Sequence, residues 1–509
     1  MKVNRILTSL LAALLLTGAL TACANGEDTP AETKDSGRST SSVEGETELT
    51  DNLPDNLDYG GDEISIISRY QEGWTSGEIA VESLRSEPVN DAVYERNKAV
   101  EERLSVTINS IEDNNSDYNA VPNKVALAVN AGTHEYDIMA AACLTSTDQA
   151  LRGIFVNLMN TEYLDLTKPW WTQGINEVLE YRNSLYLTTG SMLLSVYRFS
   201  FVTVFNQSLF TNAEQPFLYK YVQDGTWTLD KQIELVPLFH KDDGNGNQDR
   251  DGDVYGLISS NVLSIDPYWS SCKVDIVQKD SDGDFTLVFD SGKLHDVAEK
   301  LIELYHHTDN AVLCLPKRTW DAEQDEIRDM FSKGYAAMAT LRVLELENAS
   351  MRNMEDQFGV VPMPKYNQAQ DRYYTYLHDQ FTVIGIPTTI SGDRLEEVSA
   401  VLEAMGSASY TIVKPVYYEE TLRTKIAQDP QSSEMMELVI DSIHVDAGIL
   451  YNSALNGFNG SLRSIVSSGV NNTVSIYRAK DLAARKSLTN MIQKLDKVAA
   501  KQAAQGSRS

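Results

Sequence analysis

The sequence predicts an α/β fold built around a largely parallel β-sheet. Apolar runs typical of strands alternate with amphipathic helical stretches between residues 62 and 141. A β-α-β-α-β order implies right-handed crossovers and a sheet that is covered by helices on both sides. The chain has 509 residues, and about 450 of them follow a polar N-terminal region, which is enough for two or three packed domains.

The individual elements follow from local patterns. An alternating apolar run predicts a strand directly after the turn at Gly60 and Gly61. Apolar residues at helical spacing from Val93 to Leu104 predict a helix, and Gly132 is a typical residue at the end of the next one. On these grounds we expect strands at 62–68, 106–111, 136–141, 185–189, 201–205, 286–289, 358–361 and 381–386, and helices at 90–104, 118–130, 230–239, 294–305, 323–331, 394–405 and 479–504.

The N-terminus has the pattern of an export signal. Lys2 and Arg5 precede an apolar run over residues 6–20, and Cys23 follows the tripeptide Leu-Thr-Ala. Leu-Thr-Ala-Cys resembles the lipobox of bacterial lipoproteins, which implies cleavage after residue 22 and acylation of Cys23. A plain secretory signal and an uncleaved anchor helix are the alternatives. The lipoprotein interpretation predicts a protein held by lipid on the extracytoplasmic face of the cell membrane.

A polar, acidic stretch follows Cys23. Residues 23–58 contain many Ser, Thr, Asp and Glu residues and almost no large apolar side chain before Leu49. Such a stretch buries too little apolar surface to offset the entropy of ordering it. We therefore expect a disordered linker that like-charge repulsion extends away from the anchoring surface.

Charge and motifs exclude several classes of function. The formal net charge is −30, which argues against nucleic acid as a partner, because phosphates need a basic surface. Gly-x-Ser-x-Gly, His-Glu-x-x-His and phosphate-loop motifs are all absent from the sequence. The cysteines besides Cys23 lack the spacing of a metal site. We expect Cys143, Cys272 and Cys314 to be mostly buried apolar side chains, with a Cys272–Cys314 disulfide left open.

Five short segments in a fixed order carry a family resemblance. They read GTHEYDIM at 132–139, DLTKPWW at 165–171, VFNQSLF at 204–210, FSKGYAAM at 331–338 and FGVVPMPK at 358–365. Together they resemble bacterial extracellular solute-binding proteins of family 1, which serve carbohydrate import. The resemblance covers residues 62 to about 460, and its strength lies in the order of the segments.

The resemblance implies a two-lobed periplasmic-binding-protein-like fold with a hinge and an interlobe cleft. We expect residues 62–165 and about 335–378 in the first lobe, and about 166–334 and 379–509 in the second. The implied function is that of the lipid-anchored substrate-binding component of an ABC importer, a monomer without catalytic activity that captures an oligosaccharide and delivers it to the permease subunits. The alternatives are a surface-anchored carbohydrate-active enzyme and a ligand-presenting partner of a membrane sensor.

Aromatic and charged residues are the candidates for ligand contact. Sugars present flat apolar faces between hydroxyl groups, so aromatic side chains with a few polar groups suit them. Core packing is the alternative role for each tryptophan, and a structural charge is the alternative for the two polar residues. The candidates are Trp74, Trp170, Trp171, Trp269, Trp320, Arg342 and Asp379.

An acidic loop at residues 243–253 is a candidate calcium site. Oxygen-bearing side chains stand at every second position, and Ca²⁺ takes six to eight oxygen ligands. The loop departs from an EF-hand, since Gln248 and Val254 stand where Gly and Glu are expected. The alternative is a solvated turn rich in Asp and Gly. The predicted ligands are Asp243, Asn245, Asn247, Asp249, Asp251 and Asp253.

Overall fold

A computed structural model of the chain describes residues 50–250, 252–260, 262–289, 292–315, 320–419 and 430–506. The predicted signal peptide, Cys23 and most of the predicted linker lie outside these residues. The last part of the linker region is packed against the fold, contrary to expectation. Leu53 is buried in the core, and Asp51 forms an ion pair with Arg103 at 2.7 Å. Within the described part of the chain, no helix is long and apolar enough to span a membrane.

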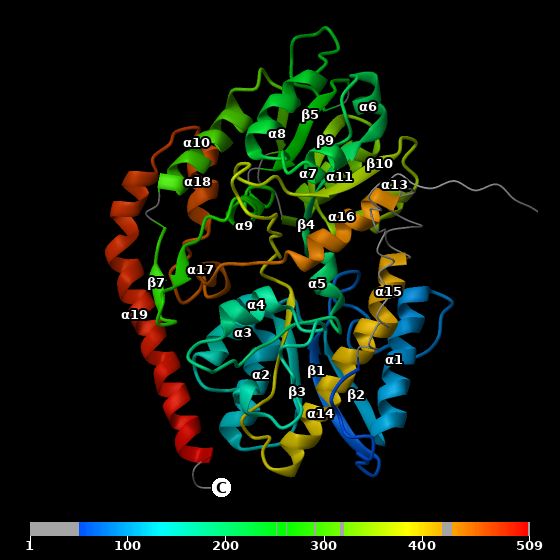
Figure 1. Cartoon of the computed structure of the whole chain (residues 1–509), viewed down its shortest axis with the longest axis vertical. Helices are drawn as coiled ribbons and strands as arrows, with labels where there is room; N and C mark the ends of the chain where they lie inside the picture. Colours follow the sequence, from blue (N-terminus) through cyan, green and yellow to red (C-terminus); the bar gives the residue numbers. More distant parts are fainter. Residues whose placement is uncertain are drawn as a thin grey trace, which may run out of the picture. The chain divides into compact units, whose positions relative to one another are not determined.

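The first sheet has the strand order β11-β3-β1-β2. Its strands are β1 (Asp62–Arg69), β2 (Val106–Asp113), β3 (Ile138–Ala142) and β11 (Thr382–Gly385). β1 pairs in parallel with β2 and β3, whereas β11 is an antiparallel edge strand beside β3. The predicted parallel arrangement is therefore confirmed for three strands. Figure 1 shows α1 (Pro88–Leu104) next to β2 and α2 (Ala120–Ala131) next to β3.

The second sheet has the strand order β10-β4-β9-β5-β8. Its strands are β4 (Phe201–Asn206), β5 (Tyr255–Ser260), β8 (Val312–Leu315), β9 (Ala336–Arg342) and β10 (Phe358–Pro362). β5 is parallel to β8 and β9, and β4 is antiparallel to β9 and β10. The hairpin expected near residue 286 is present as β6 (Val277–Lys279) and β7 (Phe285–Leu287).

The expected division between the lobes is wrong for the later segments. β9 and β10, which we placed in the first lobe, pair with β4 in the second sheet, and β11, which we placed in the second lobe, pairs with β3 in the first. The apolar pattern predicts a buried strand but carries no information about which sheet it joins. Residues 185–189 form no named strand and contribute an isolated bridge between Thr188 and Ile384.

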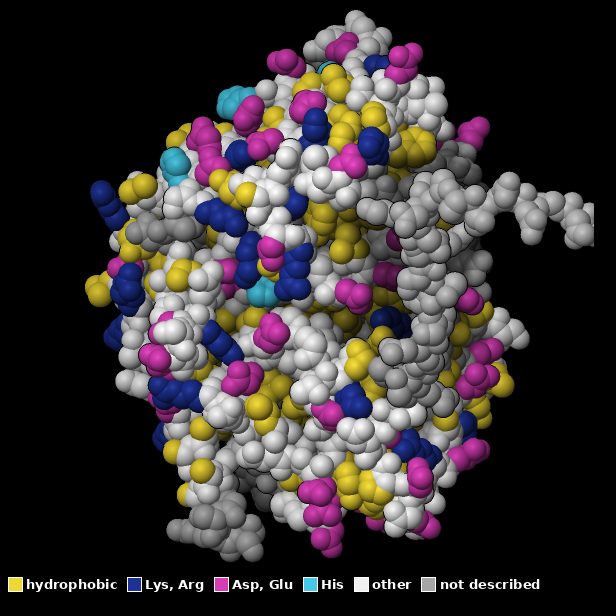
Figure 2. Space-filling view, in the orientation of Figure 1, with side chains coloured by type: hydrophobic (Ala, Val, Ile, Leu, Met, Phe, Trp, Pro, Cys, Tyr) yellow, Lys and Arg dark blue, Asp and Glu magenta, His cyan; other side chains and the backbone are white. Residues whose placement is uncertain are grey.

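Helices cover the two sheets and connect them. Those not yet named are α3 (Cys143–Ala150), η1 (Leu158–Asn160), α4 (Gln173–Leu179), α5 (Leu194–Arg198), α6 (Gln207–Asn212), α7 (Leu218–Gln223), α8 (Leu229–Leu235), η2 (Val236–Phe239), α9 (Pro267–Ser271), α10 (Gly292–His306), α11 (Trp320–Ser332), α12 (Val343–Leu346), α13 (Ala349–Arg352), α14 (Asp393–Ala408), η3 (Ser409–Val413), α15 (Lys414–Tyr417), α16 (Pro430–Asp441), α17 (Ala447–Leu450), α18 (Gly460–Ser468) and α19 (Thr473–Gly506). Figure 2 shows Asp and Glu side chains spread over one whole face, as the net charge leads one to expect.

The C-terminal helix α19 contacts parts of the fold that belong to both sheets. Near its start, Thr473 lies beside His295 of α10, with 2.9 Å between Oγ1 and Nδ1. Near its end, the side chain of Gln502 donates to the carbonyl of Phe155 at 2.7 Å and accepts from the amide of Asn157 at 3.0 Å. Phe155 is bridged to Pro387, just after β11 of the first sheet. The predicted terminal helix is confirmed and is longer than expected at its start (Figure 1).

Candidate functional site

The loop that follows β1 is held by a dense set of hydrogen bonds. The backbone carbonyl of Gln71 accepts from the amides of Trp74 and Thr75, each at 3.0 Å, and from the amide of Ser76 at 3.1 Å. Thr75 Oγ1 donates to the carbonyl of Arg69 at 2.9 Å and accepts from the Gln71 amide at 3.0 Å. Gly73 has a φ of 71°, in the left-handed region that favours glycine. The loop thus holds Trp74 in a defined position at the carboxyl end of β1.

A pocket of about 380 Å³ lies between this loop and the end of β9; we call it the cleft pocket. Ligands of open α/β folds bind at such carboxyl ends of strands and between domains. Apart from Trp74 and Leu344, its walls are polar, charged or glycine residues from loop 72–74, α11 and the segment around α12. The lining residues are Glu72, Gly73, Trp74, Asp325, Arg328, Arg342, Leu344, Glu345, Glu347 and Asn348.

Arg342 and Trp74 meet across this pocket. The guanidinium carbon of Arg342 lies 4.6 Å from the centre of the Trp74 ring, a cation–π distance. The ring also contacts Phe199 edge to face, with 5.3 Å between ring centres. Arg342 is 1% exposed, whereas Trp74 is half-buried. Both were predicted as ligand contacts, and the structure brings them together at one pocket.

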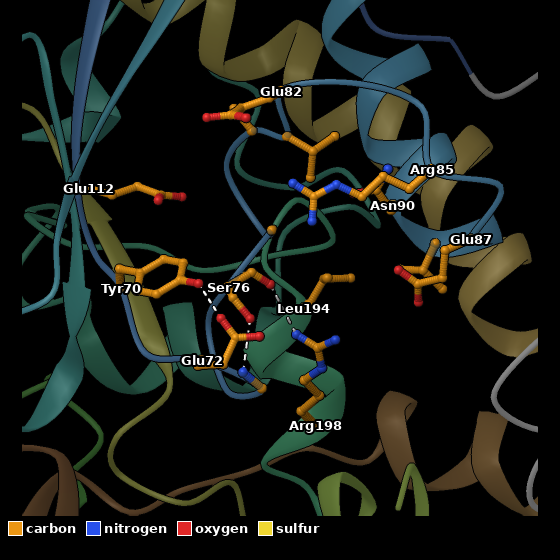
Figure 3. Close-up of a pocket in the computed structure, with 15 residues that line it drawn as sticks. Tyr70, Glu72, Ser76, Glu82, Arg85, Glu87, Asn90, Glu112, Leu194 and Arg198 are labelled. Atoms are coloured by element: carbon orange, nitrogen blue, oxygen red, sulfur yellow. Dashed lines mark hydrogen bonds between the residues drawn. The ribbon is translucent and has the colours of Figure 1, made fainter.

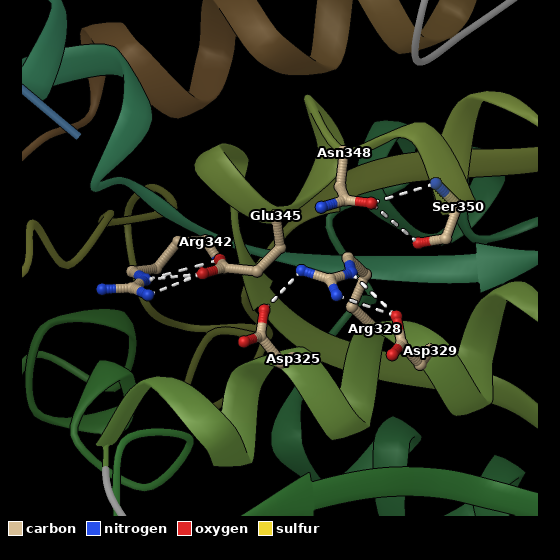
Figure 4. Close-up of polar contacts among 7 residues, drawn as sticks. All are labelled: Asp325, Arg328, Asp329, Arg342, Glu345, Asn348 and Ser350. Carbon is tan, nitrogen blue, oxygen red and sulfur yellow. Dashed lines mark hydrogen bonds and ion pairs between the residues drawn. The ribbon is translucent and has the colours of Figure 1, made fainter. Parts of the chain in front are cut away.

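Carboxylates position the arginines of the cleft pocket (Figure 4). Glu345 accepts from Arg342 Nη2 at 2.6 Å, and both side chains are buried. Arg328 on α11 pairs with Asp325 at 2.5 Å and with Asp329 at 2.8 Å. Such charge-assisted hydrogen bonds fix the direction of a guanidinium group. The pocket therefore presents charged groups whose geometry is set by the protein.

Asp379, another predicted ligand contact, lies close enough to Asp266 and Arg463 to be affected by their charges. Burial and the negative charge of Asp266 raise the pKa of Asp379 to about 6, and Arg463 acts in the opposite direction. Asp266 is 1% exposed and forms a two-point ion pair with Arg463. The neighbouring His378 lies 3.4 Å from Arg342, and burial and the charge of Arg342 lower its pKa well below the ordinary value. Asp379 does not line the cleft pocket.

A second pocket of about 440 Å³ lies on the other side of the loop; we call it the side pocket (Figure 3). Most of its lining residues are polar, charged or glycine residues. They come from the loop 70–87, the start of α1, the end of β2 and the region of α5. Sequence reasoning missed this pocket, because the loop at residues 76–87 has no aromatic or metal-type motif to mark it. The lining residues are Tyr70, Glu72, Gly73, Ser76, Gly77, Ala80, Val81, Glu82, Arg85, Glu87, Val89, Asn90, Glu112, Leu194 and Arg198.

Trp170 and Trp171 lie away from both pockets. Each is 1% exposed, and Trp171 Nε1 donates to Glu403 at 3.1 Å. Burial raises the pKa of Glu403 to about 7, while the hydrogen bond from Trp171 acts in the opposite direction. Both tryptophans line a separate pocket of about 230 Å³ beside Tyr197. Their burial favours packing, which was one of the two roles considered for them.

Trp269 lies outside both pockets. Trp269 is 1% exposed and donates through Nε1 to the carbonyl of Asn459 at 3.1 Å. This environment corresponds to the packing alternative. α11 begins at Trp320, but the side chain of this residue lies outside what the structure describes.

The acidic loop is organised by hydrogen bonds to its own backbone. Asp253 is buried, and its carboxylate accepts from the amides of Asp243 and Asp249, each at 3.0 Å. These two backbone hydrogen bonds lower the pKa of Asp253. Its carboxylate oxygens lie near those of Asp242 and Asp243, all within 4.8 Å. A cation would gain three carboxylates here, including that of Asp242, which was not predicted.

The other predicted ligands of the loop form turns. The side chains of Asn245 and Asn247 are exposed, and Asn245 hydrogen-bonds to Asp249. Asp251 lies outside the described residues. Of the predicted ligands, Asp243 and Asp253 are the ones whose carboxylates lie close enough together to share a cation. Calcium binding stays a prediction.

Cys143, Cys272 and Cys314 are free thiols. The Cys272–Cys314 disulfide that we left open is therefore absent from the structure. Burial raises the pKa of Cys272 to about 12 and that of Cys314 also to about 12. Cys143 and Cys272 are buried and Cys314 is half-buried, so the expectation of mostly buried side chains is confirmed.

Comparison with known proteins gives the fold. No protein-family model and no curated protein matches the chain. Among solved structures, the cyclic α-maltosyl-1,6-maltose binding protein from Arthrobacter globiformis is similar, with 13% identity, a TM-score of 0.54, and coverage of 86% of this chain and 99% of that one. A cyclo/maltodextrin-binding protein complexed with maltotetraose is similar with 10% identity, a TM-score of 0.51, and coverage of 86% and 97%. The chain therefore has the predicted two-lobed periplasmic-binding-protein-like fold.

Proposed function

We propose that this protein is the substrate-binding component of an ABC importer and that it binds an oligosaccharide in the cleft pocket. The observation that carries the proposal is a half-buried tryptophan, Trp74, in a pocket otherwise lined almost wholly by polar groups from the ends of both sheets. An aromatic face suits the apolar side of a sugar ring, and fixed charged groups suit its hydroxyls. The two solved structures of similar fold are sugar-binding proteins by name, which supports the same ligand class.

The state of the acidic groups favours binding over catalysis. Three carboxylates of the cleft pocket are each paired with an arginine: Asp325 with Arg328, Glu345 with Arg342, and Glu347 with Arg198. A glycoside hydrolase needs two carboxyl groups that are free to act on opposite sides of the scissile bond. Carboxylates held by arginines instead orient hydrogen-bond donors toward a ligand. We therefore favour a protein that binds its ligand without catalysing a reaction over a carbohydrate-active enzyme.

Delivery to a permease and attachment through Cys23 belong to the same proposal. The lipobox-like sequence Leu-Thr-Ala-Cys supports a lipid anchor, which would hold a captured sugar beside the importer in the membrane. A ligand-presenting partner of a membrane sensor would use the same cleft and anchor. Uptake of labelled sugar by cells with and without the protein separates these two roles.

Isothermal titration with a panel of oligosaccharides tests the binding proposal. We expect heat of binding with one sugar series, and at least about tenfold weaker binding by Trp74→Ala, because stacking and hydrogen-bond contacts together exceed 1.4 kcal/mol. The matched control is Trp269→Phe, which alters a buried tryptophan outside the pocket. It should lower the melting temperature without changing the sugar affinity. Binding of peptides or lipids but of no sugar would overturn the carbohydrate assignment.

A further inference from the structure

We propose that the side pocket continues the cleft pocket and binds the distal units of the same oligosaccharide. The inference rests on the proposed function and deepens it, because it makes the ligand a chain of several sugar units that runs across the loop after β1. The two pockets share two lining residues, Glu72 and Gly73. Each has a volume in the range of small-molecule sites.

At Gly73, which lines both pockets, no side chain stands between them. Gly73 has no side chain, and apart from its own atoms and those of its two chain neighbours no atom lies within 4 Å of the place where a Cβ would stand. Its amide donates to Ser76 Oγ at 2.9 Å, which holds the turn closed. A ligand chain can therefore pass over Gly73 without displacing protein atoms.

A half-buried ion pair links the walls of the two pockets. Arg198 lines the side pocket and Glu347 lines the cleft pocket, with 3.2 Å between Nε and Oε1. Arg198 also donates to the carbonyls of Trp74 and Ser76, at 3.3 and 3.5 Å. The same guanidinium therefore supports the Trp74 side of the loop and the floor of the side pocket. The contacts of Arg198 therefore connect residues that line both pockets.

The position and chemistry of the side pocket also suit a sugar. It lies where β1 and β2 end, the same edge of the first sheet that carries Trp74. In Figure 3 the side chains of Tyr70, Glu82, Arg85 and Glu112 surround one open space. Carboxylates accept hydrogen bonds from sugar hydroxyls, and a guanidinium donates them. Within the described residues, the Arg85 guanidinium has no hydrogen-bond or ion-pair partner, so its donors are available to a ligand.

Binding measured against chain length tests the inference. Glucose, xylose and mannose oligomers of two, four and six units are titrated into the full mature protein by calorimetry. Arg85→Ala removes the free donors, and Ala80→Phe adds bulk to the lining. Arg152→Ala is the matched control, since it removes an exposed arginine that lines neither pocket. Melting temperatures are recorded for each variant.

We expect affinity to rise from two to six units in the series that binds. Arg85→Ala and Ala80→Phe should each lower the affinity for the six-unit sugar about tenfold. For Arg85→Ala, this loss is about the worth of one hydrogen bond to a charged group. The affinity for the two-unit sugar should stay within about twofold, and Arg152→Ala should change neither. If long and short sugars bind and neither variant affects them, the side pocket is not a subsite while the proposed function stands. If no oligosaccharide binds, the proposed function itself fails.

Discussion

Replacing Asp379 by Asn is expected to stabilise the protein at alkaline pH. Burial and Asp266 raise the pKa of Asp379 from 3.8 to about 6. One pKa unit corresponds to about 1.4 kcal/mol, so the ionised carboxylate costs the folded state about 3 kcal/mol. Asparagine has nearly the same shape and carries no charge. At about pH 8 we therefore expect Asp379→Asn to raise the free energy of unfolding by up to about 3 kcal/mol.

The difference in free energy of unfolding between Asp379→Asn and the natural protein should depend on pH. Below about pH 4 the carboxyl is protonated in both the folded and the unfolded chain, so the variant and the natural protein should be equally stable. Between about pH 4 and 6 the unfolded chain loses the proton first, and the natural protein loses stability as the pH rises. Above about pH 6 the difference should stay constant. Asp379→Asn should remove this part of the pH dependence.

Urea unfolding followed by tryptophan fluorescence measures this difference at each pH. Asp282→Asn, at an exposed turn, is the matched control and should change the stability little. If Asp379→Asn is no more stable than the natural protein at about pH 8, the carboxylate is not desolvated and the reasoning is refuted.

Three further outcomes are expected. Arg463→Met leaves the carboxylate of Asp266 buried without its partner, so the free energy of unfolding in urea should fall by about 3–5 kcal/mol. The fall should be smaller in the double variant that also carries Asp266→Leu. An equal fall in both variants would contradict the argument that the two residues form a pair. Calcium should raise the melting temperature if the loop around Asp253 binds it, and EDTA should reverse the rise; identical melting curves would leave the loop as a turn. Cys23→Ala should move the protein from the membrane fraction into the medium, and unchanged retention would count against a lipid anchor.

Local patterns predicted most of the secondary structure, because the spacing of apolar residues depends only on whether that segment is a helix or a strand. The alternation at residues 62–68 and the helical spacing before Leu104 both correspond to elements of the structure. The partner of a strand is not encoded locally, which is why β9, β10 and β11 were assigned to the wrong lobes.

The candidate site was predicted in part. Arg342 is the last residue of β9, the strand that begins with Ala-Ala-Met, and Trp74 follows β1, so both stand at strand ends where ligands bind. Trp269 has an equally polar sequence context but lies in the core, since its position depends on α9 packing near Asn459. Arg85 belongs to a stretch without periodicity, and only the fold brings it to the same pocket as Glu112 of β2.

The position of β11 has a consequence for how the chain acquires its structure. The first sheet is begun by β1 to β3 but receives its edge strand only from residues 382–385, and Gln502 caps the backbone near Phe155 later still. Contacts between such distant parts of a chain form slowly, because the intervening loop must close first. The first lobe therefore stays incomplete until almost the whole polypeptide is available. For the exported lipoprotein that we propose, such a delay would keep the chain unfolded until it has crossed the membrane.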